Sequence, residues 1–577
     1  MKNSVKTIFG LVLMGTLAVS CLDLSPEAQL SDNQVWSKAD NFQLFANQFY
    51  SWTKDFSAKD NYQSPLSDGP HSDLRSDLLC DYHAANIYSN GTNPIPNKSS
   101  DFNTLYKRIY YTNLLIKNAA SFPNQKEIAA PLGEAYFFRA YFHFELVQLF
   151  GDAILVTAPL DIDSKQLFGK RNDRLEVVSQ CIDDLKKAAD LLPEVPSLPG
   201  RLCSYTAWAF LSRVALYEGS WQKFHKDNVT DAKTLFKEAS DAALKVMESK
   251  NYELFYSDKL GGGNSYRYMF ILESVDCNPA KLTKADNKEY ILYTRHDQAL
   301  KPINFNITKA AFNNVYNVTK KMADMYRCQD GLPISISPLF KGYDTAVSEF
   351  ENRDNRMNGT LLKHGQPCWN NEGNFSRKTW DDADLANSMN ANVRTSTGYC
   401  NYKWATEREV PTESESYDYP VIRYAEVLLN YAEAVFEYSD AISDADLDIS
   451  LNLVRRRSNP DMKPLSNALV AAHPQMSMRE EIRAERTVEL FLEGFRIDDL
   501  KRWKTAEKEM PGDLLGIKWK GTWFEANWTN QEKPINDDGN IIMYTGRKWE
   551  QKHYLLPLPS DQRQLNKELG QNPGWEK

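Results

Sequence analysis

The 577-residue chain is acidic: Asp and Glu number 77 against 68 Lys and Arg, which gives a formal net charge of −9. This charge repels polyanions, so nucleic acid and anionic lipid surfaces are excluded as expected partners. Charged residues make up 25% of the chain and hydrophobic residues 42%, which are the proportions of a globular protein with a large core.

Residues 1–20 have the composition of a signal peptide. Lys2 and Lys6 supply a positive start, and the apolar run over residues 8–19 is too short to span a bilayer. Small residues then precede Cys21, as in the lipobox of a lipoprotein. We expect lipidation of Cys21 and a tether over residues 21–32, with the lipid as the only membrane contact. The alternative is an ordinary signal peptide, with Cys21 placed there by coincidence.

The remaining cysteines show no metal-binding pattern. They are scattered, without a C-x-x-C motif or a Cys/His pair at zinc spacing: Cys80, Cys181, Cys203, Cys277, Cys328, Cys368 and Cys400. We expect small buried side chains, no metal site and no cofactor. Whether two of them form a disulfide stays open.

Helical periodicity dominates the first half of the chain. Helices are predicted over residues 34–50, 103–120, 134–150 and 174–192. The third carries Ala135, Phe138 and Phe142 on one stripe, and further aromatic residues widen that stripe. A helix that is apolar on so much of its circumference is expected to be buried between other helices.

Two later stretches have the pattern of paired helices. Residues 207–219 are followed by 231–249, and residues 425–434 by 447–457, with small residues alternating with large ones. This alternation is typical of tetratricopeptide-like hairpins, although their strict period is absent. We therefore predict a mostly α fold of about four such hairpins, packed with long irregular loops and minor β structure.

The chain between residues 251 and 420 is rich in Gly, Asn, Asp, Ser and aromatic residues and shows little periodicity. No low-complexity tract or Pro-rich linker divides the sequence. We predict a single domain over residues 33–577, with an N-terminal helical part (33–250), a loop-rich insert (251–420) and a C-terminal helical part with a tail (421–577). Long ordered loops commonly carry function.

Residues 485–503 are the most informative segment. Apolar residues at helical spacing predict one helix with an apolar face: Val488, Phe491, Leu492 and Phe495. Glu489 and Glu493, like Glu426 and Glu433 upstream, could be the paired carboxylates of a glycosidase, which retaining enzymes hold roughly 5 Å apart. Alternatively, they are buried charges that fasten the helix through arginines, and the expected partners are Arg486, Arg496 or arginines on the Arg423 helix.

The same segment carries a family resemblance. Its pattern E-R-x-x-E-L-x-x-E-G-x-R-x-x-D-L-x-R-W resembles the C-terminal hallmark of the SusD/RagB family. Further phrases are similar to the family in the expected order, among them residues 322–334 (MADMYRCQDGLPI), 420–434 (PVIRYAEVLLNYAEA) and 571–575 (QNPGW). The resemblance runs from Cys21 to Trp575.

Membership would imply a SusD-like helical fold and a non-catalytic role in nutrient capture. Proteins of this family are surface lipoproteins of the outer membrane that bind glycans for a SusC-like TonB-dependent transporter. The resemblance therefore implies an oligosaccharide ligand, that transporter as a partner, and a lipid-anchored position facing the exterior. Because the ligand surface varies with the glycan, the resemblance assigns no binding residue.

Candidate ligand residues come from the irregular loops. Sugar binding needs flat aromatic faces for the apolar sides of the rings and planar polar groups for the hydroxyls. Loop segments that combine both give the candidates Tyr82, His83, Asn86, Tyr88, Tyr293, Arg295, His296, Trp369 and Asn370. A fourth aromatic cluster, within residues 519–528, is expected to pack on the core or to meet the transporter.

The sequence thus predicts a non-catalytic lipoprotein that binds glycan and passes it to a transporter. Three alternatives remain: a binding lipoprotein for another nutrient such as peptide, a glycoside hydrolase that uses paired glutamates, and a helical protein scaffold. No G-x-S-x-G, H-E-x-x-H or P-loop motif occurs, which disfavours the common hydrolases and nucleotide-dependent enzymes.

Overall fold

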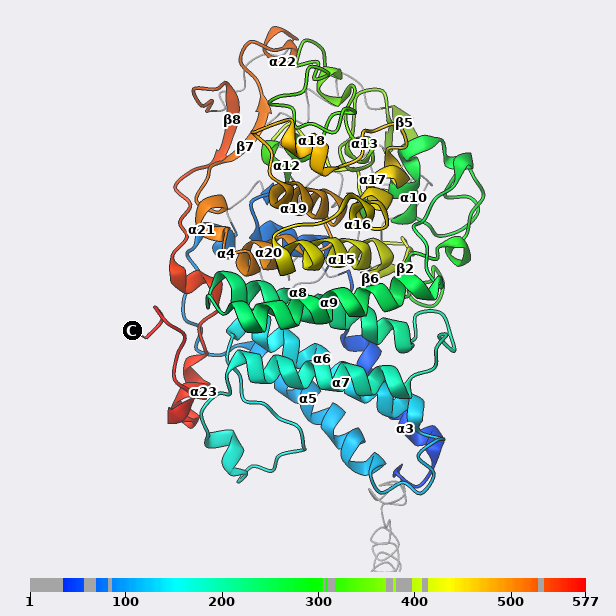
Figure 1. The fold of residues 1–577 in the computed structure, drawn as a ribbon, viewed down its shortest axis with the longest axis vertical. Helices are drawn as coiled ribbons and strands as arrows, with labels where there is room; N and C mark the ends of the chain where they lie inside the picture. Colours follow the sequence, from blue (N-terminus) through cyan, green and yellow to red (C-terminus); the bar gives the residue numbers. More distant parts are fainter. Residues whose placement is uncertain are drawn as a thin grey trace, which may run out of the picture.

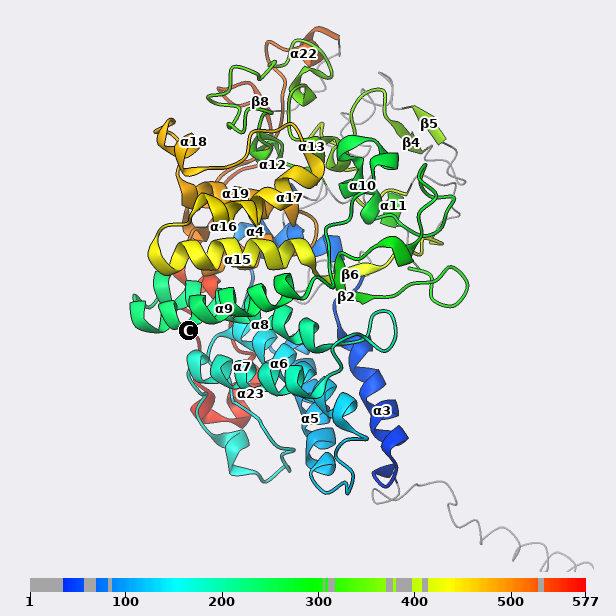
Figure 2. The ribbon, with the colours of Figure 1, turned by 45° about the vertical axis from the view of Figure 1, so that its right-hand side comes forward.

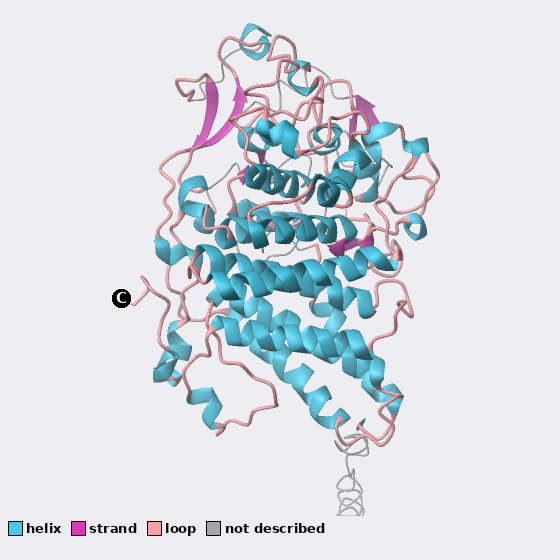
Figure 3. Cartoon of the chain, in the orientation of Figure 1, coloured by secondary structure: helices cyan, strands magenta, loops and turns pink. Residues whose placement is uncertain are grey.

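The computed structural model describes residues 35–56, 69–80, 86–304, 307–309, 317–369, 377–379, 397–406, 413–527 and 534–576. Within these ranges the chain is mostly helical, with a few short strands (Figure 3). The signal peptide, Cys21 and the tether lie outside the described residues. No helix in those ranges combines the length and the apolar character needed to cross a membrane.

Long helices stack side by side through the lower and middle parts of the molecule (Figure 1). These helices pack in sequence order, each contacting the next one along the chain. These helices are α3 (Ala39–Asn47), α5 (Ser100–Ala119), α6 (Ala129–Phe150), α7 (Arg174–Leu191), α8 (Ser204–Phe224), α9 (Val229–Ser249), α15 (Tyr424–Ser439), α17 (Leu451–Ser458) and α19 (Met478–Glu489).

Local sequence explains why these helices begin, end and pair. Asp173 caps α7 through the backbone N–H of Leu175, and Gly151 ends α6 with φ +74°. Helix α6 is buried on nearly all sides between α5 and α7, as its wide apolar stripe predicted. Helix α8 approaches α9 closely at Gly219, where a Cβ would lie 2.9 Å from the Phe236 ring. The pairs α6–α7 and α8–α9 confirm the predicted tetratricopeptide-like arrangement.

Short elements make up most of the upper part, where much of the chain between residues 251 and 420 lies, and the short helix α23 lies at the lower part (Figure 1). Four antiparallel pairs form within the described ranges: β1 (Leu79–Cys80) with β3 (Asn317–Val318), β2 (Tyr290–Thr294) with β6 (Tyr419–Arg423), β4 (Pro367–Trp369) with β5 (Arg377–Thr379), and β7 (Leu514–Lys518) with β8 (Asn540–Tyr544). The short helices are α4 (Ile87–Asn90), α10 (Ser265–Met269), α11 (Ile307–Lys309), α12 (Lys320–Met325), α13 (Asn355–Thr360), α16 (Asp444–Asp448), α18 (Asn467–Ala471), α20 (Arg496–Arg502), α21 (Ala506–Glu509), α22 (Trp523–Asn527) and α23 (Ser560–Leu565).

Three predicted helices differ from the observed ones. Of the helix predicted over residues 34–50, α3 covers only Ala39–Asn47 and is followed by the 3-10 helix η1 (Gln48–Trp52), and residues 447–457 are divided between α16 and α17. The prediction of one helix through residues 485–503 is wrong, because α19 ends at Glu489 and α20 begins at Arg496. Between them Leu492 has φ +60° and Gly494 has φ +82°.

Residues far away in the sequence stabilise the break between α19 and α20. The carbonyl oxygens of Phe491 and Leu492 accept hydrogen bonds from Lys403 Nζ (2.5 Å) and Trp404 Nε1 (3.1 Å). The backbone N–H of Leu492 donates to Asp73 Oδ2 at 2.7 Å. These tertiary bonds satisfy backbone groups that a continuous helix would pair internally, so the apolar spacing alone could not reveal the break.

The buried cysteines agree with the expectation of small core side chains. Cys80, Cys181, Cys203, Cys277, Cys328 and Cys400 are all buried. The described residues contain no cluster of His, Cys, Asp and Glu that could hold a metal ion.

Candidate functional site

The glutamates of the C-terminal hallmark belong to a buried ionic network. Glu489 pairs with Arg356 (2.9 Å), Arg423 (2.6 Å) and Arg457 (2.5 Å). Glu493 pairs with Lys403 and Arg423, each at 2.7 Å. Burial alone would raise the pKa of Glu489, and the surrounding guanidinium groups overcome this effect and hold its pKa well below the usual range. A carboxylate fixed in this way fastens helices and is not available as a general acid.

Of the alternative partners expected for these glutamates, the structure shows Arg423. Arg423 pairs with both, as expected, whereas Arg486 pairs with Asp499 at 2.9 Å and Arg496 with Asp77 at 2.9 Å. The helix break at residue 490 turns the Arg496 side chain towards the N-terminal part, which spacing along one helix could not indicate.

The second candidate carboxylate pair is also structural. Glu426 is bonded by Arg213 at 2.6 Å, and Glu433 accepts from Arg502 and from Trp503 Nε1, both at 2.6 Å. Burial opposes the charge of Glu433, and Arg502 outweighs it and lowers the pKa to about 2. Neither pair opens onto a cleft, because all four glutamates are at least 97% buried.

Of the first predicted ligand segment, Tyr82 and His83 lie outside the described residues. Asn86 is 4% exposed, and its side-chain oxygen caps α4 by accepting from the N–H of Tyr88 at 2.9 Å. Tyr88 is half-buried against the core, and burial raises its pKa to about 12. In the described part of this segment, Tyr88 therefore offers a half-buried ring, and the amide oxygen of Asn86 is already bonded.

The second predicted segment forms the end of β2. The Tyr293 ring is half-buried and packs 5.9 Å from that of Tyr290, and Arg295 is exposed. His296 is 7% exposed, and its Nε2 lies 2.7 Å from Asp55 Oδ1. Tyr293 and Arg295 can therefore meet a ligand at the surface, while His296 ties β2 to the chain after η1.

The third predicted segment is described only in part. The backbone of Trp369 ends β4, while its side chain and all of Asn370 lie outside the described residues. Figures 1 and 2 both place β2 and the β4–β5 pair on one side of the molecule and α4 away from them. The structure therefore separates the Asn86–Tyr88 candidates from the other two segments. In the fourth cluster, Trp519 and Phe524 are buried in the core.

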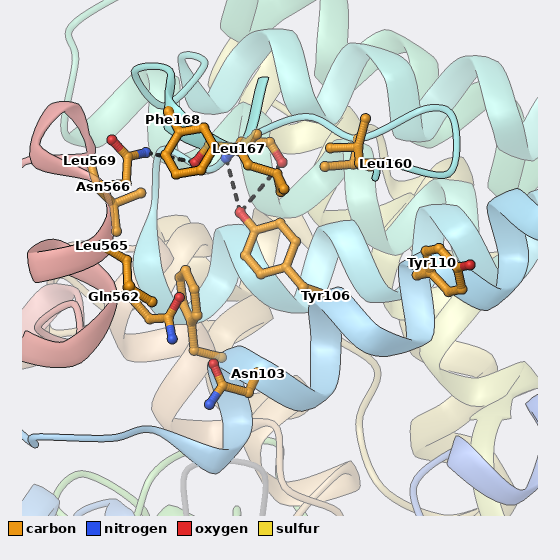
Figure 4. Close-up of a pocket in the computed structure, with 13 residues that line it drawn as sticks. Asn103, Tyr106, Tyr110, Leu160, Leu167, Phe168, Gln562, Leu565, Asn566 and Leu569 are labelled. Carbon is orange, nitrogen blue, oxygen red and sulfur yellow. Dashed lines mark hydrogen bonds between the residues drawn. The ribbon is translucent and has the colours of Figure 1, made fainter. Parts of the chain in front are cut away.

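A pocket lies elsewhere, beside α5 and α23 in the lower part of the molecule (Figure 1), and Figure 4 shows it in close-up. It has a volume of about 420 Å³ and is enclosed by α5, the chain between α6 and α7, and the C-terminal α23 with the 3-10 helix η11 (Lys567–Leu569). Its lining residues are Phe102, Asn103, Tyr106, Tyr110, Ile154, Val156, Leu160, Leu167, Phe168, Gln562, Leu565, Asn566 and Leu569.

Sequence reasoning missed this pocket, although one signal was present. Phe102, Tyr106 and Tyr110 are spaced four apart and form an aromatic stripe on one face of α5. Such a stripe is ordinarily core packing. The other two walls come from residues about 50 and 460 positions further along the chain, so no local pattern brings them together.

Comparison with known proteins identifies the family. The model for the SusD family matches residues 284–575, and a model described as "Starch-binding associating with outer membrane" matches residues 21–216. Among curated relatives, SusD-like protein P25 of Formosa agariphila is 30% identical over 133 residues, 22% of this chain and 24% of that protein. SusD-like protein P38 of the same organism is 25% identical over 236 residues, 38% of this chain and 44% of that protein.

Solved structures share the fold. A SusD-like carbohydrate binding protein from Bacteroides fragilis matches with a TM-score of 0.72 and 21% identity, covering 93% of this chain and 99% of that one. A laminarin binding SusD-like protein matches with a TM-score of 0.57 and 17% identity, again over 93% and 99%. Identities this low establish the fold alone. Since the SusD family model covers just over half of the sequence, the chain belongs to the SusD family.

Proposed function

We propose that this protein is an outer-membrane lipoprotein that binds a nutrient glycan and passes it to a SusC-like TonB-dependent transporter. The observation that carries the proposal is the match of two SusD-type models that together cover most of the chain. The lipid on Cys21 would anchor the protein on the exterior face of the membrane. The laminarin binding relative supports a polysaccharide as the ligand class.

Binding without catalysis is supported by the carboxylates. A retaining or inverting glycosidase needs two carboxyl groups facing a shared cleft at separations of roughly 5 to 9.5 Å. The two glutamate pairs that the sequence offered are buried and bonded to arginines. We therefore assign them to the fold.

We place the glycan at the end of β2, with the β4–β5 pair on the same side of the molecule (Figures 1 and 2). Tyr293 offers a ring beside the exposed Arg295, whose guanidinium can donate to sugar hydroxyls. The aliphatic part of Arg295 lies close to Gly200, where a Cβ would be only 3.1 Å from Arg295 Cγ. The Gly200 turn thus supports the side chain from below, and Trp369 and Asn370 would complete the surface.

Isothermal titration tests this proposal directly. The protein from residue 22 onward, without its lipid, is titrated with starch- and laminarin-derived oligosaccharides and with a peptide mixture. We expect binding to at least one oligosaccharide. Arg295→Ala should lower the affinity roughly tenfold, which corresponds to about 1.4 kcal/mol of binding free energy. Arg456→Ala is the matched control, because Arg456 is an exposed arginine of α17. Binding to peptide but to no oligosaccharide would refute the sugar assignment and leave the transport role open.

Transport is tested separately in cells. Deletion of the gene should abolish growth on the bound glycan, and a Cys21→Ala variant, which cannot be lipidated, should fail to restore it. Full restoration by Cys21→Ala would refute the anchored position.

A further inference from the structure

The pocket between α5 and α23 has a chemistry unlike that of a sugar site. Of its 13 lining residues, ten are aliphatic or aromatic, three are amides, and none is charged. The Asn566 amide is already used: Nδ2 donates to the carbonyl oxygens of Leu167 (3.0 Å) and Gly169 (2.8 Å), and Oδ1 accepts from the N–H of Glu568.

Two amides remain for a ligand. The side chains of Asn103 and Gln562 form no hydrogen bond within the part of the chain that the structure describes. Figure 4 shows both at the same end of the pocket, below Tyr106, with Tyr110 towards the opposite end. Two amides can satisfy one or two polar groups, whereas a sugar ring lying in the pocket would place most of its hydroxyls against apolar walls.

The pocket walls are held in place by bonds that no ligand has to form. The Tyr106 hydroxyl accepts from the N–H of Ile154 at 3.0 Å and lies 3.4 Å from the carbonyl oxygen of the same residue (Figure 4). Arg171 bonds the carbonyl oxygen of Leu569 (3.0 Å) and Asn572 Oδ1 (2.7 Å), which fastens the C-terminal wall to the loop after α6. Because the cavity exists before a ligand binds, binding requires little further ordering of the protein.

Several apolar side chains at this pocket remain open to solvent. Leu565 is 69% exposed, Phe168 50%, Tyr110 41% and Leu167 37%. Covering these apolar side chains with an apolar ligand removes them from water, which favours binding. The volume of about 420 Å³ lies within the range of small-molecule sites.

We propose that this pocket binds a small neutral molecule with a flat apolar body, such as an aryl ring, and one hydroxyl or carbonyl group facing Asn103 and Gln562. Neutrality follows from the lining, since no charged side chain among the lining residues could compensate a ligand charge that is moved out of water. The Tyr106 and Phe168 rings supply faces or edges for a flat body. This site is separate from the proposed glycan surface and does not depend on that proposal.

Fluorine NMR on the protein from residue 22 onward tests the ligand class. The probe is 4-fluorobenzyl alcohol, and 4-fluorobenzoate is its charged counterpart of similar size. We expect the alcohol signal to broaden on addition of protein and the benzoate to bind at least about tenfold more weakly, a difference of about 1.4 kcal/mol. A broadened alcohol signal should persist in excess glucose. Equal binding of both probes, or no broadening of the alcohol at millimolar concentration, would overturn the proposal.

Variants locate the binding. Leu160→Trp fills the cavity and should abolish the broadening, while Val195→Trp adds the same ring at a residue that is 64% exposed and does not line the pocket. The double variant Asn103→Ala/Gln562→Ala changes two side chains on the pocket rim. It should lower the affinity for the alcohol several-fold, as expected for the loss of hydrogen bonds of about 0.5–1.5 kcal/mol each. If the double variant binds like the unchanged protein and Leu160→Trp also retains binding, the probe binds elsewhere and the assignment fails.

Discussion

Replacing Glu489 by glutamine should destabilise this protein strongly. Within the described residues, five carboxylates and five cations form one connected network: Asp354, Glu289, Glu485, Glu489 and Glu493 with Arg356, Arg423, Arg455, Arg457 and Lys403. No side chain among them is more than 3% exposed. Because the charges balance, Glu489→Gln leaves one buried positive charge without compensation.

The magnitude follows from the contacts. Two charges 4 Å apart in a protein attract by about 4 kcal/mol at an effective dielectric constant of 20. Glu489 touches three guanidinium groups at 2.5–2.9 Å, and the desolvation of the four ions offsets most of that attraction. Measured losses for breaking a buried pair are about 3–5 kcal/mol, and we expect this range for Glu489→Gln.

Urea unfolding followed by circular dichroism measures the effect. The matched control is Glu480→Gln on the same helix, because the Glu480 side chain is 67% exposed and pairs with Arg483 at 3.3 Å. This control should change the free energy of unfolding by less than about 0.5 kcal/mol. If Glu489→Gln were no more destabilising than Glu480→Gln, the network would not be what holds α19 in place.

The same carboxylate predicts a pH dependence. The folded-state pKa of Glu489 is well below the value of about 4.3 expected in the unfolded chain. Its contribution to stability is therefore present above pH 4.3 and is lost as the pH falls towards the folded-state pKa. Between pH 7 and pH 3, the free energy of unfolding should fall more steeply for the unchanged protein than for Glu489→Gln. Parallel losses would contradict the assigned pKa direction.

Three further predictions concern packing and the separation of sites. Gly219→Ala should cost about 1–3 kcal/mol by overpacking α8 against Phe236, measured by urea unfolding, and an unchanged midpoint would show that the helices can move apart. Asn86→Ala should lower the stability by about 1 kcal/mol through loss of the α4 cap and leave the affinity for the glycan unchanged. A large loss of affinity in calorimetry would instead place Asn86 in the site. Leu160→Trp should leave oligosaccharide binding unchanged in the same titration, because the pocket shares no residue with the β2 end.

Sequence patterns predicted the long helices well because local periodicity dictates them. The wide apolar stripe of α6 and the small residues of α9 specify burial and close pairing whatever the rest of the chain does. The break between α19 and α20 was not predictable, because Lys403, Trp404 and Asp73 impose it from 88 to 419 positions away.

Candidate binding residues were harder to predict for the same physical reason. Rings and amides in a loop look alike whether they face solvent or the core. His296 is buried against Asp55 and Asn86 caps a helix, while Arg295, in the same kind of sequence, reaches solvent. Only the tertiary contacts of each side chain distinguish these outcomes, and those contacts come from segments far away in the sequence.

The C-terminal hallmark is best explained as a device that joins the insert to the helical stack. Its glutamates bind Arg356 and Lys403, within residues 251–420, together with Arg423 at the end of β6 and Arg457 on α17. Because this joint is buried, any member that keeps it can vary the surface around β2 and β4–β5 without disturbing the fold. A motif fixed by such internal charge balance therefore identifies the family and carries no information about the ligand, which the exposed loops must specify.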